Sequence, residues 1–115
     1  MSMLIERLTD YGCHVKEAMG RFLDDEDFYE MCFHKFIADK SFDRLSEAVA
    51  AGDAGACFEA AHDLKGTSAN MGITPINRLV VEIVEEFRQG NIPADIGDSL
   101  AELESVRQDL QKIAE

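Results

Sequence analysis

Residues 61–72 read AHDLKGTSANMG and decide the fold, because they predict an amphipathic helix that ends at a glycine. At about 100° per residue, one side of this helix collects the apolar and small side chains. These are Cys57, Ala60, Ala61, Leu64, Thr67, Ser68 and Met71. His62 falls on the opposite side, so packing in a core does not explain it.

Small residues surround His62 on its own face of the predicted helix. The positions that share this face are Gly55, Phe58, Gly66 and Ala69. A glycine such as Gly66 in mid-helix costs about 1 kcal/mol relative to alanine, and close approach of another molecule would explain its presence. Lys65 adds a positive charge that can reach an anion held at the imidazole. The stretch therefore predicts a histidine that handles phosphate.

The same stretch resembles the core motif of histidine phosphotransfer (HPt) domains. In that motif a histidine is followed by Leu, Lys, Gly, a small residue and a later Gly, which here are His62, Leu64, Lys65, Gly66, Ser68 and Gly72. The resemblance implies a phosphocarrier without kinase activity of its own. Such a protein takes a phosphoryl group from an aspartyl phosphate on a response-regulator receiver domain and passes it to another receiver. A hybrid histidine kinase is a further partner that the resemblance implies.

The expected chemistry assigns separate roles to His62 and Lys65. His62 is the expected phosphoacceptor, because the neutral imidazole is abundant near neutral pH and its free nitrogen is nucleophilic. Lys65 is expected to stabilise charge on the phosphoryl oxygens, and Arg88 on the next predicted helix is a further candidate for that role. We expect Mg²⁺ on the partner receiver, and no metal or cofactor held by this chain.

A receiver is expected to dock on the face that carries His62. Phe58 would supply apolar contact, while Gly55, Gly66 and Ala69 would let the partner come near. The alternative for Phe58 is packing beneath an N-terminal helix. HPt domains often carry Gln or Glu beside the imidazole on the helix after the motif. Val84 stands at that position here, which leaves open whether His62 has an orienting hydrogen bond.

Helix signals extend from the motif toward the N-terminus. We expect short helices over residues 2–11 and 15–23, followed by one long helix from Phe28 to Ala51. Ser41 is a plausible N-cap for a break near residue 40, but the continuous apolar phase favours a single rod.

Toward the C-terminus the signals are equally regular. Asp53 can cap the motif helix, Thr74 and Pro75 form an N-cap and first-turn proline, and a last helix begins near Asp95. The pattern predicts an all-α protein, an antiparallel up-down-up-down four-helix bundle with two short N-terminal helices covering one end. We expect one HPt-like domain over residues 1–115.

Composition excludes several classes of partner. The net charge of −12 argues against nucleic acid and anionic membranes, both of which attract basic surfaces. Three cysteines show no zinc-like spacing and form no complete disulfide framework, so we expect them to be reduced. The N-terminus lacks the apolar stretch of a signal peptide. A monomeric cytoplasmic protein is therefore expected.

Two alternatives remain at this point. One is the phosphoacceptor helix of a sensor histidine kinase, although that helix usually continues with a polar residue and a proline, whereas Gly66 and Thr67 stand here. The other is a helical adaptor or metal-binding bundle without phosphate chemistry. Glu59 and His62 have the Glu-x-x-His spacing of such bundles, but no second copy occurs.

Overall fold

Helix α5 (Ala54–Met71) carries the motif, and both of its ends are capped as the sequence predicts. A computed structural model describes residues 2–115. Asp53 begins the helix, since its carboxylate accepts the Ala56 N–H at 3.0 Å. Gly72 ends the helix in the left-handed conformation, with φ +72°. The buried side is the predicted one except for Thr67, which is half-buried. It consists of Cys57, Ala60, Ala61, Leu64, Ser68 and Met71.

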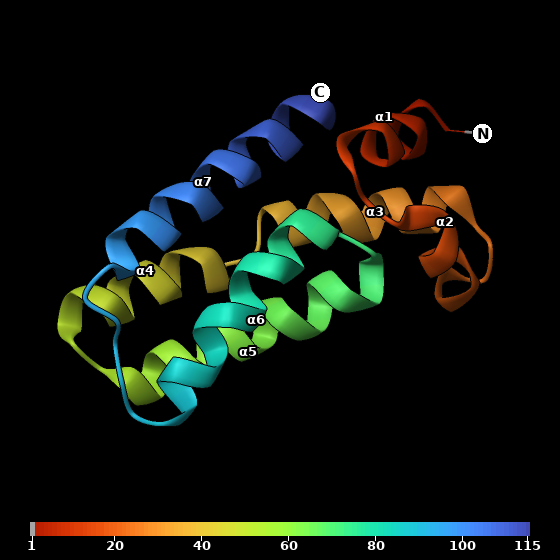
Figure 1. The fold of residues 1–115 in the computed structure, drawn as a ribbon. Coiled ribbons are helices and arrows are strands. Elements are labelled where there is room, and N and C mark those ends of the chain that lie inside the picture. Colours follow the sequence, from red (N-terminus) through yellow and green to blue (C-terminus); the bar gives the residue numbers. More distant parts are fainter. Residues whose placement is uncertain (1) are drawn as a thin grey trace.

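Two helices flank α5. Helix α6 (Thr74–Arg88) returns along α5 after a very short link, so the two are antiparallel, and it makes the most extensive contact with α5 (Figure 1). Helix α4 (Ser41–Ala51) also packs against α5. The start of α6 lies one residue from the prediction, because Ile73 is the N-cap and Thr74 is already helical. Pro75 stays within the first turn, where its missing N–H costs no hydrogen bond.

The chain over residues 28–51 forms two helices, so the prediction of one continuous rod is wrong. Helix α3 (Glu26–Ile37) is separated from α4 by residues 38–40. The carboxylate of Asp39 accepts the Ser41 N–H at 2.7 Å, a local bond that replaces helical hydrogen bonding at this point. Ser41 is the first residue of α4 rather than its N-cap.

The N-terminal helices lie at the end of the molecule where α5 stops and α6 starts (Figure 1). Helix α1 (Met3–Tyr11) packs against α3 and α7, and α2 (Val15–Ala18) packs against α5. The predicted helix over residues 15–23 is shorter than expected, because a 3₁₀ turn, η1 (Met19–Phe22), follows α2.

Gly72 joins this N-terminal segment to α5. Its carbonyl accepts the His14 N–H at 2.8 Å. A Cβ on Gly72 would lie 2.8 Å from the His14 carbonyl carbon, closer than a real Cβ tolerates. Glycine is therefore required here both by the positive φ and by the approach of the His14 backbone.

Helix α7 (Ile96–Ile113) packs against α6 and also contacts α1 and α3. Its C-terminal end lies beside α1 (Figure 1). Arg107 donates from Nε to the Ile37 carbonyl at 3.0 Å, which ties α7 to the end of α3. The Tyr11 hydroxyl donates to Asp109 at 2.7 Å, which ties α1 to α7. Residues 2–115 contain helices and no strand, so the all-α class is confirmed.

Candidate functional site

His62 lies in the middle of α5 with its side chain exposed to solvent. Gly66, one turn further on, is exposed as well, and a Cβ built on it would meet nothing within 4 Å. A shallow hollow runs along this face of α5 and is lined by His62, Asp63, Gly66, Thr67 and Asn70. The histidine thus stands on an open part of the helix, the arrangement that its sequence neighbours predict.

Phe58 lies directly against the imidazole of His62. The two ring centroids are 5.4 Å apart and the ring planes differ by 29°, which is a stacked arrangement. The guanidinium carbon of Arg88 lies 4.9 Å from the centroid of the same Phe58 ring. Arg88 also donates from Nε to Glu85 Oε1 at 3.3 Å. Spacing of four residues on a helix could have indicated the Phe58–His62 contact, but no local signal indicates that Arg88 joins it.

Phe58 is half-buried and packs partly against the core. Its ring lies against His62 of α5 and Arg88 of α6. Two small residues of the expected docking face, Gly55 and Ala69, are exposed. The structure therefore brings the expected docking residues to one accessible face of α5.

Lys65 is half-buried, and its backbone carbonyl is the centre of a small polar network. The carbonyl accepts hydrogen bonds from Ser68 Oγ and from Asn77 Nδ2, each at 3.2 Å. Asn77 Nδ2 also lies 3.2 Å from Ser68 Oγ. Ser68 lies on the side of the helix that the sequence predicts to be buried, and its hydroxyl bonds to a backbone carbonyl. Asn77, from α6, was not predicted, and its two contacts join α6 to α5.

Val84 is fully buried in α6 and offers only hydrocarbon. In the described part of the chain, no hydrogen bond is formed to either ring nitrogen of His62. The orienting hydrogen bond that the sequence left open is therefore not formed within residues 2–115. Next to His62 in the chain, Asp63 pairs with Arg44 of α4 at 3.7 Å, with both side chains 59% exposed, so the pair contributes little stability.

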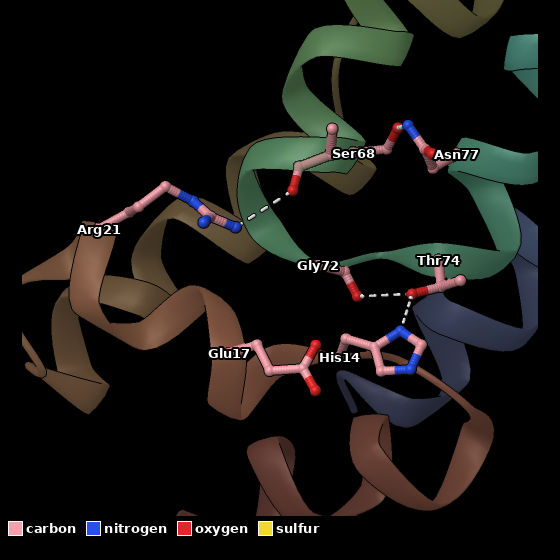
Figure 2. A pocket seen from close by; sticks show the side chains of 8 residues that line it. His14, Glu17, Arg21, Ser68, Gly72, Thr74 and Asn77 are labelled. Carbon is pink, nitrogen blue, oxygen red and sulfur yellow. Dashed lines mark hydrogen bonds between the residues drawn. The ribbon is translucent and has the colours of Figure 1, made fainter.

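A second hollow lies where the N-terminal segment meets the end of α5 (Figure 2). His14 Nδ1 lies 2.5 Å from Thr74 Oγ1 on one side of it. On the other side, Arg21 donates to the carbonyls of Asn70 and Ala69 at 2.8 and 3.2 Å. These polar groups are occupied in joining η1 to the end of α5 and the α1–α2 link to the start of α6. Arg21 satisfies carbonyls that α5 leaves open.

The three cysteines are free thiols, as expected. Burial raises the pKa of the Cys13 thiol to about 11 and also raises the pKa of Cys57, so neither is a ready nucleophile. Among residues 2–115, no group of three or more His, Cys, Asp or Glu side chains is placed to hold a metal ion. None of the described helices is both long and apolar enough to cross a bilayer.

Fold and site together define an all-helical domain with His62 exposed in mid-helix beside an open Gly66. The chain belongs to the Hpt domain family, whose sequence model matches residues 38–115. The match covers α4 to α7 and therefore includes the motif, which confirms the resemblance. No curated protein and no solved structure matched the chain. Hpt domains are phosphocarriers of two-component systems, where they interact with receiver domains and kinases.

Proposed function

We propose that this protein accepts a phosphoryl group on His62 from the aspartyl phosphate of one receiver domain and passes it to another receiver. The observation that carries the proposal is the exposed imidazole of His62 beside an open Gly66, within the matched Hpt region. A receiver must bring its aspartate against the histidine, and the absence of a side chain at Gly66 supports that approach.

In the proposed reaction, the unprotonated ring nitrogen of a neutral His62 donates its lone pair to phosphorus. The P–O bond to the receiver aspartate breaks, and its electron pair leaves with the aspartate, which becomes a carboxylate. The second ring nitrogen keeps its proton, so the product is a protonated phosphoimidazole. Transfer to the next receiver is the reverse step on a different aspartate.

Charge on the phosphoryl oxygens has to be balanced during both steps. We propose Lys65 as the cation that this chain provides, since its ammonium is in no ion pair among residues 2–115. Mg²⁺ on the receiver supplies the remaining positive charge in this proposal. The chain then needs no cofactor and no kinase activity of its own.

Gly55, Phe58, Gly66 and Ala69 form the proposed docking surface. The residues lie on one accessible face of α5 with His62, and an apolar ring among small residues suits a close protein contact. We further propose that α4, α5, α6 and α7 form the antiparallel four-helix bundle, and that α3, which precedes α4, extends its first helix. The proposed protein is one domain over residues 1–115 and acts as a cytoplasmic monomer.

The test is phosphoryl transfer from purified receiver domains that have been phosphorylated with acetyl phosphate. The wild-type protein is expected to gain acid-labile, alkali-stable phosphate, and His62→Gln is expected to gain none. His34→Gln is the matched control, because His34 is also an exposed helical histidine, on α3. Labelling that persists in His62→Gln would remove this residue from the mechanism. A survey of receivers from the source organism then identifies donor and acceptor.

A further inference from the structure

No hydrogen bond within the described chain orients the imidazole ring of His62, so another contact has to position it for attack. Neither ring nitrogen is hydrogen-bonded within the described chain, and Val84 offers no polar atom. An exposed side chain flanked by glycine is otherwise free to occupy several rotamers. In-line phosphoryl transfer depends on a fixed direction of attack, so an unrestrained ring would lose rate.

We propose that Phe58 is the positioning residue of the phosphoacceptor, and that it holds the imidazole plane of His62 by ring stacking. This inference rests on the proposed function, since it concerns the orientation of the same nucleophile. Side chains on an α-helix lean toward its N-terminus, which brings His62 over the turn that carries Phe58. The centroid separation of 5.4 Å and the interplanar angle of 29° are those of an offset stack.

Phe58 can orient another ring because it is itself held. It is half-buried against the core, and the Arg88 guanidinium lies 4.9 Å from its ring centroid. Arg88 in turn contacts Glu85, with Nε and Oε1 3.3 Å apart. The His62 ring is thus connected to α6 through a second ring and a cation.

A stack restrains the ring in a different way from a hydrogen bond. A hydrogen bond to the imidazole occupies one nitrogen and selects a tautomer. The Phe58 contact uses the face of the ring and leaves both nitrogens unoccupied. One nitrogen is then available for phosphorus, and the other can hold its proton toward solvent or toward the receiver.

The first experiment measures the stack without any phosphate. The carbon-bound ring protons of His62 are followed by NMR in the wild-type protein, Phe58→Leu and Phe58→Tyr. We expect these resonances to carry a ring-current shift that Phe58→Leu removes and Phe58→Tyr retains. Resonances that do not move in Phe58→Leu would overturn the inference.

The second experiment measures reactivity without a docking partner, using phosphoramidate as a small phosphoryl donor. Because a stacked pair contributes a modest energy, Phe58→Leu is expected to label about 3- to 10-fold more slowly than wild type. Phe58→Tyr should restore the rate, and Arg88→Gln should slow it by a smaller factor. Phe28→Leu is the control, because Phe28 is a partly exposed phenylalanine on α3 that contacts Phe22 instead.

The outcomes separate this inference from the proposed function. Wild-type protein that takes phosphate from neither phosphoramidate nor any receiver would refute the proposed function, while the NMR comparison would still decide the stack. Wild-type protein that is labelled at the same rate as a folded Phe58→Leu variant would refute only the positioning role. A Phe58→Tyr variant as slow as Phe58→Leu would also refute it, because both rings can stack.

Discussion

Substitution of Gly66 is expected to stabilise the protein and impair phosphoryl transfer at the same time. A Cβ at this position meets nothing within 4 Å, and the backbone is ordinary helix, so Gly66→Ala introduces no strain. The gain is then the helix propensity difference, about 1 kcal/mol in the free energy of unfolding. For a chain of 115 residues this corresponds to a rise of roughly 4 °C in Tm.

Transfer should change in the opposite direction. A side chain at Gly66 fills the open surface beside His62 and holds the receiver away from the imidazole. Because a displacement of about 1 Å can cost about 100-fold in rate, Gly66→Gln is expected to lower transfer by about that factor, with Gly66→Ala between it and wild type. Labelling by phosphoramidate, which needs no docking, should stay at the wild-type rate.

The assay combines urea denaturation, single-turnover transfer from a phosphorylated receiver, and phosphoramidate labelling. Gly97→Ala is the control, because Gly97 lies in α7 and a Cβ there also meets nothing within 4 Å. That variant should keep normal transfer. The reasoning fails if Gly66→Gln transfers phosphate at the wild-type rate, since the small residue would then have no role in docking. A loss of stability in Gly66→Ala would refute the steric argument.

Two further predictions concern stability. Gly72→Ala should lower the free energy of unfolding by about 3 kcal/mol, because the cost of the left-handed backbone is added to a clash with the His14 carbonyl. The control is Gly52→Ala, at φ +69° in open space, which should lower it by about 1 kcal/mol. Equal losses in urea denaturation would contradict the close approach. Burial, and then the hydrogen bond to Asp109, raise the pKa of Tyr11 to about 12. The pKa of Tyr11 in the folded protein is above that of unfolded tyrosine, which is about 10. The stability contributed by the protonated Tyr11 hydroxyl is therefore complete below pH 10 and is lost as the pH rises toward 12. Stability measured against pH should fall less steeply above pH 10 in Tyr11→Phe than in wild type, and parallel curves would disprove the linkage.

Helix boundaries at which the apolar phase also stops could be predicted, and the boundary through which it continues could not. Asp53 and Gly72 define α5 because capping depends on residues within one turn of the helix end. The break between α3 and α4 was missed because the apolar phase continues through it. Phe36 and Phe42, on either side of the link, still pack together at 5.6 Å between ring centroids. In the structure, the Asp39 carboxylate accepts the Ser41 N–H at the point where the helix stops.

The sequence by itself determined that His62 faces solvent, because helical periodicity is a local property. It decides which side of the helix each of the 18 residues of α5 occupies. It likewise determined the glycine-lined face and the membership of the motif in its family. The tertiary structure alone decided what packs against Phe58 and what bonds the Lys65 carbonyl from the next helix. Arg88 reaches Phe58, and Asn77 reaches the Lys65 carbonyl, only because α6 folds back along α5 in one particular register. Contacts between separate helices depend on that register, which no local pattern of residues encodes.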